Sequence, residues 1–257
     1  MSHILGTYHL GVGLSEALPA PHDRHLDEAR TLVLELDFGR IDPIAFAQIM
    51  VLPEGEDLEA LIGATLFAKV VAALPDVPAE AWHRMRPWAA MTIVMARSQA
   101  EAQNERNGDE EAISLLDVQV HARALEHQVT VRGLETPEEQ GELMSSLPLE
   151  GIVEFLEHSL GEPEAAATET SARTNAYIDG DLEALEREFF DPEELAAAPA
   201  IWDALLFDRN ARWVSTLEEE LRAGRAFIAV GLGHLLGDRG LLRLLERDGF
   251  TVRRLSR

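Results

Sequence analysis

The feature that most constrains the fold is a short pattern that occurs near both ends of the 257-residue chain. Residues 6–9 read Gly-Thr-Tyr-His and residues 231–234 read Gly-Leu-Gly-His, and an apolar run precedes each. A glycine at the end of a strand allows a sharp turn, after which the histidine points off the edge of the sheet. Ligands bind at that edge in open α/β sheets. The pattern therefore predicts an α/β fold in which His9 and His234 meet at one site.

Short apolar segments predict five strands, at residues 4–10, 31–36, 128–133, 226–230 and 251–255. Helical patterns separate them, which favours parallel pairing in an α/β sheet. Each end of the chain reads strand, GxxH, glycine-containing loop, helix, strand, so we expect a mostly parallel central sheet built from these two units. We expect a single domain over residues 1–257. A large helical insertion at about residues 40–225, containing one central strand near 128–133, is expected to cover the site.

Two local signals subdivide the expected insertion. Pro87 interrupts a helical pattern over residues 79–102, and proline lacks the amide hydrogen that a helix interior needs. Residues 160–174 are acidic and rich in small side chains, a composition that favours a linker. The sequence thus predicts one helix break and one linker within the insertion.

The composition restricts the partners and the metal ligands that are possible for this chain. The chain has 46 acidic and 22 basic residues, a formal net charge of −24, which argues against nucleic acid and anionic membranes as partners. It has no cysteine, so a metal site must use histidine and carboxylate, which suit Zn, Mn, Co or Fe. No run approaches the ~20 apolar residues of a membrane-spanning helix, and no signal peptide is evident. We expect a cytoplasmic protein, or a secreted or periplasmic one if a leader has been removed.

Two charged residues interrupt apolar patterns. Glu35 lies in the run Val-Leu-Glu-Leu at residues 33–36, where an ionised carboxylate is costly unless paired or bound to metal. The alternative is a structural ion pair. Asp37 would share the face of Glu35 if the strand continued. Arg209 lies in the apolar stripe of a helix predicted at residues 200–223, so it needs a carboxylate or an anionic ligand unless its head reaches water. Glu35 is its expected partner.

Three further residues are secondary candidates. Glu135 follows the third predicted strand. The helix predicted to start just after it accounts for the residues next to Glu135, but not for Glu135 itself. Asn210, next to Arg209, could orient a carboxylate or stabilise a developing oxyanion. Arg212 lies near the edge of the same apolar stripe and is the second candidate for the role assigned to Arg209.

These residues lie in segments that resemble the TraB/GumN family, which is related to the Tiki metal-dependent proteases. The resemblance covers nearly the full length and is carried, in order, by residues 6–9, 32–37, 86–88, 116–117, 133–136, 208–213 and 230–242. It implies the fold of erythromycin esterases and of a haem-binding lipoprotein family, a mostly parallel sheet with helices around it. By this resemblance, the catalytic set is His9, Glu35, Arg209 and His234.

The resemblance also implies an activity, that of a metal-dependent hydrolase, a Tiki-like peptidase acting on a peptide or protein. His9, Glu35 and His234 would hold a divalent Mn, Co or Zn ion with one position open for water. Two alternatives remain: a metal-independent esterase-type hydrolase that uses the same four residues, and a non-enzymatic protein that binds a peptide or haem. A second copy of the chain is a further candidate partner, because the apolar helices around residues 45–74 could form a lid, part of the core or a dimer surface.

Overall fold

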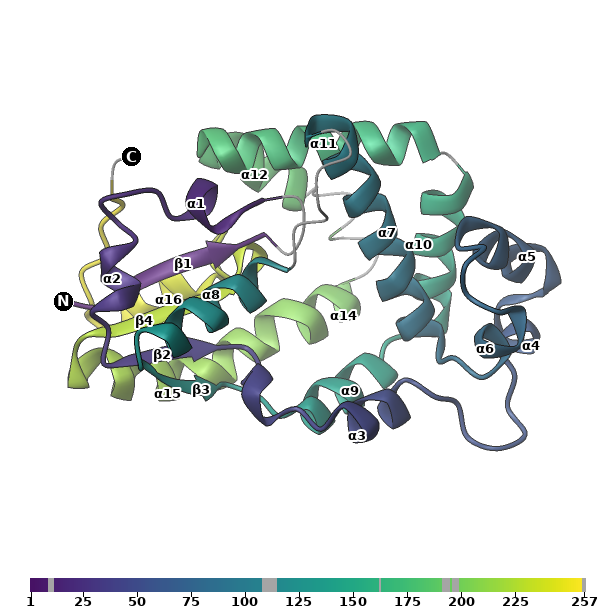
Figure 1. Cartoon of the computed structure of the whole chain (residues 1–257), viewed down its shortest axis with the longest axis horizontal. Coiled ribbons are helices and arrows are strands. Elements are labelled where there is room, and N and C mark those ends of the chain that lie inside the picture. Colours follow the sequence, from purple (N-terminus) through teal and green to yellow (C-terminus); the bar gives the residue numbers. More distant parts are fainter. Residues whose placement is uncertain (9–11, 108–114, 162, 191–194, 196–198, 256–257) are drawn as a thin grey trace. The chain divides into compact units, whose positions relative to one another are not determined.

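The computed structural model describes the chain except for residues 9–11, 108–114, 162, 191–194, 196–198 and 256–257 (Figure 1). The chain divides into two compact units. Unit 1 comprises Met1–Arg40, Glu111–Thr136 and Arg173–Arg257, and unit 2 comprises Ile41–Glu110 and Pro137–Ala172. The insertion expected over about residues 40–225 is therefore divided, because part of it belongs to the unit that contains the sheet.

Unit 1 contains a four-stranded parallel sheet with the strand order β1-β4-β2-β3. The strands are β1 (His3–Thr7), β2 (Thr31–Leu34), β3 (Thr130–Gly133) and β4 (Ala226–Gly231). The register aligns Leu5 with Ala229, Ala229 with Leu34, and Leu34 with Gly133. All four strands therefore end close to one edge of the sheet, and the predicted α/β class with a mostly parallel sheet is confirmed.

The prediction of a fifth strand at residues 251–255 is wrong. These residues are irregular, and the segment Thr-Val-Arg-Arg-Leu contains only two strongly apolar side chains. Arg254 donates instead to the carbonyl of Gly180 at 2.6 Å. The second chain-end unit thus lacks its closing strand, and β3 forms the sheet edge beside β2.

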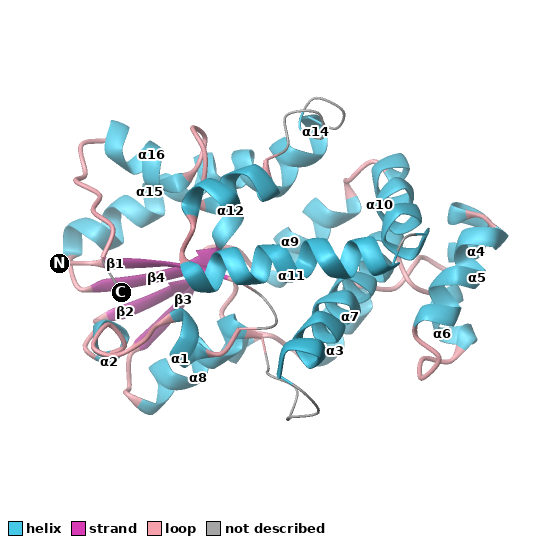
Figure 2. Ribbon diagram, turned by 90° about the horizontal axis from the view of Figure 1, so that it is seen from above, coloured by secondary structure: helices cyan, strands magenta, loops and turns pink. Residues whose placement is uncertain are grey.

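Helices cover both faces of the sheet, as all-parallel sheets require (Figure 2). Because side chains alternate along a strand, Leu32 and Leu34 join one buried cluster and Val33 joins another. The first cluster includes residues of α1 (Leu14–Ala17), α2 (Arg24–Asp27) and α8 (Leu116–Glu126). The second includes residues of α15 (Asp208–Ala223) and α16 (Leu241–Arg247). The near-continuous apolar runs of β2 and β4 follow from this two-sided burial.

Unit 1 also contains η1 (Phe38–Arg40), α12 (Leu182–Phe189), α14 (Pro199–Trp202), η2 (Asp203–Phe207) and η3 (Leu232–His234). η2 is a π-helical turn that joins α14 to α15, because the amide of Asp208 bonds to the carbonyl of Asp203, five residues back. The helix predicted at residues 200–223 is therefore present with one widened turn.

Unit 2 is built from helices: α3 (Pro43–Ile49), α4 (Leu58–Ile62), α5 (Ala64–Ala73), α6 (Ala79–His83), α7 (Pro87–Asn107), α9 (Pro137–Ser145) and α10 (Leu149–Gly161). α7 begins at Pro87, which confirms the predicted helix break. The linker predicted at residues 160–174 is helical, because α11 spans Pro163–Asp179, although a boundary between the two units, after Ala172, falls within it. Alanine and glutamate are strong helix formers, and proline is well tolerated at a first helical position. None of the helices in the described part of the chain is long and apolar enough to cross a membrane.

Candidate active site

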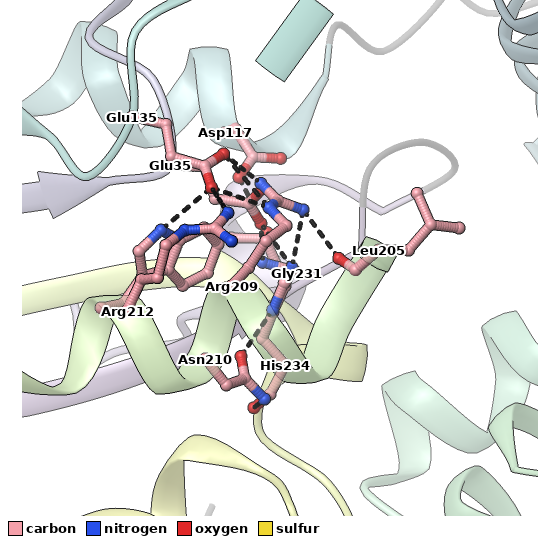
Figure 3. Close-up of polar contacts among 11 residues, drawn as sticks. Glu35, Asp117, Glu135, Leu205, Arg209, Asn210, Arg212, Gly231 and His234 are labelled. Atoms are coloured by element: carbon pink, nitrogen blue, oxygen red, sulfur yellow. Dashed lines mark hydrogen bonds and ion pairs between the residues drawn. The ribbon is translucent and has the colours of Figure 1, made fainter. Parts of the chain in front are cut away.

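Polar side chains gather at the carboxyl edge of the sheet in unit 1. Glu35 follows β2, Glu135 follows β3, and η3 carries His234 after β4. α15, which packs against one face of the sheet, contributes Arg209 and Asn210. Figure 3 shows Glu35, Glu135 and His234 grouped around Arg209. The parallel register thus brings together residues that are up to 199 positions apart in the sequence, from Glu35 to His234.

Arg209 uses all five of its guanidinium N–H donors. Nε donates to Glu135 (3.0 and 3.1 Å), and Nη2 donates to Glu35 Oε2 (2.7 Å) and Glu135 Oε2 (2.8 Å). Nη1 donates to the Leu205 carbonyl (3.0 Å) and to Nε2 of His234 (3.1 Å). Burial alone would lower the pKa of Arg209. The attraction of Glu35 and the hydrogen bonds between Arg209 and Glu135 outweigh this effect and raise the pKa of Arg209 above its usual value. The guanidinium therefore stays charged.

The position of Arg209 follows from its helix. Its side chain is 8% exposed and lies on the buried face of α15, four residues before Trp213. The guanidinium stacks over the Trp213 ring at 4.5 Å, and Nε1 of Trp213 donates to Glu135 at 3.2 Å. The π-helical turn η2 ends two residues before Arg209 and supplies the Leu205 carbonyl, and such turns are frequent at functional sites.

Glu35 has both carboxylate oxygens engaged. Oε1 accepts from the amide of Gly231 (2.8 Å), and Oε2 accepts from Arg209 (2.7 Å). Oε1 also lies 3.7 Å from Nε2 of His234. The predicted pairing of Glu35 with Arg209 is therefore present, and the amide at the end of β4 orients the second oxygen.

His234 has a defined tautomer. Its Nδ1 lies 2.7 Å from Oδ1 of Asn210, while Nδ2 of Asn210 donates to the carbonyls of His234 (3.2 Å) and Arg239 (3.0 Å). Because the amide nitrogen of Asn210 is committed to two acceptors, its oxygen must accept, so Nδ1 of His234 carries the proton. The lone pair of Nε2 then faces Arg209 and Glu35. Asn210 thus sets the orientation of the imidazole.

The other predicted residues lie at the rim or elsewhere. Arg212 is 57% exposed and reaches Glu135 at 3.4 Å. Asp37 lies apart from the Arg209 network, because it accepts from the amide of Gly39 (3.1 Å) and lies 3.5 Å from Nε2 of His121. His9 lies outside the described residues. Glu135, expected only as a secondary candidate, contacts Arg209 more extensively than Glu35 does.

Sequence reasoning assigned no role to Asp117, although the resemblance included it. Its carboxylate is buried and accepts a 2.8 Å hydrogen bond from the hydroxyl of Thr7, the last residue of β1. A signal was available: Asp117 lies three residues before Val120 and seven before Ala124, on the buried face of α8. A carboxylate on an apolar helix face is the same kind of signal that identified Arg209.

The donor set suits a divalent metal ion in part. Glu35 and Glu135 face the buried guanidinium of Arg209, and the exposed Arg212 also reaches Glu135, so two guanidinium groups already balance the two carboxylates. The 3.7 Å between Glu35 Oε1 and His234 Nε2 is close to the ~3.3 Å expected of two ligands on one tetrahedral ion. The neutral imidazole with Nδ1 protonated is the form in which Nε2 binds metal. The third predicted donor is His9.

A second cluster among the described residues could hold a metal. Ligand atoms of Asp57, Glu59 and His83, in unit 2, lie within 4.8 Å of one another. Local contacts account for this arrangement, because Asp57 caps α4 through the amide of Ala60 (3.2 Å) and accepts from His83 (2.8 Å). This cluster therefore has a sufficient structural explanation.

Comparison with known proteins gives one match. The model of the TraB/PrgY/gumN family matches residues 1–254, which include both GxxH segments and all the candidate site residues. Neither the curated proteins nor the solved structures give a significant match. The match covers nearly the whole chain, so the chain belongs to the TraB/PrgY/gumN family.

Proposed function

We propose that the chain is a metal-dependent hydrolase, a Tiki-like peptidase, with Glu35 and His234 at its reaction centre. The observation that carries the proposal is the convergence of Oε1 of Glu35 and the unprotonated Nε2 of His234, 3.7 Å apart at the sheet edge. A carboxylate and a neutral imidazole aimed at one point can activate a water molecule for attack on a carbonyl. Ligand sites of open α/β sheets lie at this same edge.

Glu35, His234 and His9 are the residues that would hold the ion, with Mn, Co or Zn as the candidates. When bound, a divalent ion supplies a Lewis acid that lowers the pKa of water to about 7. The 3.7 Å between Oε1 of Glu35 and Nε2 of His234 supports this part of the proposal.

The remaining residues position the reactive groups. Arg209 holds Glu35 through Oε2, and the Gly231 amide holds Oε1, so the carboxylate cannot rotate freely. Asn210 keeps the Nε2 lone pair of His234 directed at the same point. Glu135 balances the charge of Arg209 and keeps its guanidinium in the plane that reaches Glu35. Arg209 and Asn210 are thus positioning residues, and Glu35 is either the third ligand of the ion or the residue that accepts a proton from water.

The substrate class is carried by the resemblance to the Tiki proteases, and peptides or proteins are proposed on that ground. A carbonyl substrate is also what the chemistry of the centre suits, because water activation by carboxylate and imidazole serves both amide and ester hydrolysis.

One contact favours a second candidate, hydrolysis without metal. Nη1 of Arg209 donates at 3.1 Å to the same Nε2 lone pair that an ion would need. In that case the guanidinium supplies the positive charge beside Glu35, and the carboxylate activates water directly. The esterase-type alternative uses the same residues.

Metal titration combined with hydrolysis assays separates these candidates. The purified chain is stripped with chelator, reloaded with Mn, Co or Zn, and assayed on a peptide library and on activated esters. We expect metal-stimulated cleavage that Glu35→Gln or His234→Ala reduces by about 100-fold or more. Asp37→Asn is the matched control, because Asp37 is a neighbouring carboxylate outside the Arg209 network.

The outcomes are distinct. Activity that survives chelation and still requires Glu35 supports the metal-free candidate. Absence of hydrolysis by the folded, metal-loaded chain on both substrate classes contradicts the hydrolase proposal. Equal activity of wild type and Glu35→Gln contradicts the assignment of the centre.

A further inference from the structure

Arg86, in unit 2, is a half-buried arginine without a carboxylate partner among the described residues. Its Nε is buried and has no hydrogen-bond partner, and no ion pair joins its guanidinium to any residue that the structure describes. Arg209 and Arg123, by comparison, are each paired with two carboxylates. An arginine cannot shed its charge, and a buried donor such as the Nε–H of Arg86 normally has an acceptor. In a chain of net charge −24, an unpaired cation of this kind needs an explanation.

Arg86 lies in the wall of a pocket of about 180 Å³ formed by unit 2 alone. Apolar side chains form most of the lining, among them Leu52, Leu147 and Ile152. The buried indole of Trp88 also lines it, and its Nε1 donates to the hydroxyl of Ser145 at 3.1 Å, which fixes the ring. An apolar cavity of ~150 Å³ is large enough to bind benzene. The pocket therefore offers room for one small apolar group beside one cation.

Glu56 also lines the pocket. It is exposed, and among the described residues it forms no ion pair with Arg86. A carboxylate in this position repels an entering anion. The pocket thus combines a mostly apolar wall, a guanidinium whose buried Nε lacks a partner, and one carboxylate.

We propose that this pocket binds a small monocarboxylate with an apolar body the size of one aromatic ring or a short branched chain. The carboxylate accepts charge-assisted hydrogen bonds from Arg86, and the apolar body packs against Trp88 and Ile152. The carboxylate belongs either to a free acid or to the C-terminal residue of a peptide. The site is formed within unit 2, so it does not depend on the hydrolase proposal for unit 1.

Binding of phenylacetate to the full-length chain tests this proposal, with titration calorimetry and tryptophan fluorescence as the readouts. We expect phenylacetate to bind and the neutral phenylacetamide to bind at least about tenfold more weakly, because it lacks the charge that pairs with Arg86. N-acetyl-leucyl-phenylalanine tests the peptide source. If the dipeptide acid binds more tightly than phenylacetate, the source is a peptide C-terminus, and if it binds more weakly, the source is a free acid.

Substitutions locate the site. Arg86→Gln should weaken phenylacetate binding by about tenfold or more, whereas Arg84→Gln should leave it unchanged. Arg84 is the matched control because it is exposed, lies two residues away and does not line the pocket. Glu56→Gln should tighten binding. Equal affinities of wild type and Arg86→Gln, or of phenylacetate and phenylacetamide, overturn the proposal.

Thermal stability separates a ligand-binding role from a structural one. Because no described residue pairs with Arg86, Arg86→Met should keep or raise the melting temperature of the ligand-free chain. Phenylacetate should raise the melting temperature of wild type but not of Arg86→Met. If Arg86→Met and Glu56→Gln both lower the melting temperature, the two residues are structural partners and the proposal fails.

Discussion

Arg209 determines the arrangement of the candidate active site at the residue scale. Its guanidinium lies between Glu35 and Glu135, two carboxylates that would otherwise face each other with little access to water. A buried ion pair adds little net stability when intact, but loss of one partner leaves an uncompensated buried charge. The same residue also contacts His234, so its loss affects both the stability and the chemistry of the site.

Arg209→Met should therefore lower the free energy of unfolding by about 3–5 kcal/mol, measured by urea denaturation. Arg212→Gln is the control, because Arg212 is 57% exposed and its contact with Glu135 is long; its cost should stay below about 1 kcal/mol. Similar costs for the two substitutions would show that the Glu35–Arg209–Glu135 cluster is solvated.

Asn210 should control the tautomer of His234. In wild type, nitrogen NMR of the imidazole at pH 7 should show Nδ1 protonated, because Oδ1 of Asn210 accepts from it. Asn210→Leu removes the acceptor, so both tautomers should appear, and any hydrolytic activity should fall by about 10–100-fold. Protonation at Nε2 in wild type would contradict this hydrogen-bond assignment.

At the scale of elements, the close approach of two strand ends brings the carboxylates together. The Glu135 amide donates to the Glu35 carbonyl at 3.0 Å, just beyond the paired part of β2 and β3. Gly133 allows this approach, since a Cβ there would lie 2.9 Å from the Asp37 amide nitrogen and 3.0 Å from the Glu135 carbonyl oxygen. Both contacts are to backbone atoms, which cannot rotate away.

Gly133→Ala should therefore separate the ends of β2 and β3 and displace Glu135 from Arg209. We expect a loss of about 1–3 kcal/mol in the free energy of unfolding, together with reduced activity. Gly161→Ala is the matched control, because no heavy atom lies within 4 Å of a Cβ placed there. An unchanged stability of Gly133→Ala would show that the two strand ends are free to separate.

The start of β1 should make stability depend on pH. His3 stacks on His25 of α2 with ring centroids 3.8 Å apart, and burial, then His25, the N-terminal amine and His22, lower the pKa of His3 from 6.5 to about 4. Between these values the unfolded chain binds a proton that the folded chain does not, so stability falls as the pH falls from 6.5 to 4. The effect is moderated by solvent, because His3 is only half-buried.

The measurement is the melting temperature between pH 7 and pH 4.5 for wild type and His3→Phe. The decrease should be smaller in the variant, because it has no proton to gain at this position. Asp27 contributes little to the change in melting temperature between pH 7 and pH 4.5, since its pKa lies below 3.8. Parallel curves for the two proteins would contradict the role of His3.

At the scale of the whole molecule, the dominant property is a net charge of −24. An excess of one sign destabilises the compact state through self-repulsion. Several basic residues are already paired, as in the Arg123 bonds to Asp23 and Asp27, so most acidic side chains have no cation available.

Added salt should consequently raise the melting temperature. The Debye length falls from about 30 Å at 0.01 M to about 10 Å at 0.1 M salt, which screens the long-range repulsion more than the short ion pairs. Differential scanning calorimetry from 0.01 to 0.5 M NaCl measures this, with an uncharged solute at matched osmolality as the control. A melting temperature that falls with salt would show that ion pairs outweigh the repulsion.

The sequence alone was enough to predict the features that depend on a few neighbouring residues. Apolar runs located the four strands, and Pro87 marked a helix start, because periodicity and backbone chemistry act over a few residues. Charged residues within apolar patterns indicated that Glu35 and Arg209 are buried and paired, because a lone buried charge is too costly to persist.

Only the tertiary structure decided which strands pair and which polar groups meet. Residues 251–255 have a strand-like pattern but no place in the sheet, whereas β3 pairs with β2 and brings Glu135 to Arg209. Asp37, two residues from Glu35, lies instead beside His121 because the chain leaves the strand after Leu34. These outcomes depend on packing between segments more than 90 residues apart, such as β2 and β3, and no local pattern encodes such contacts.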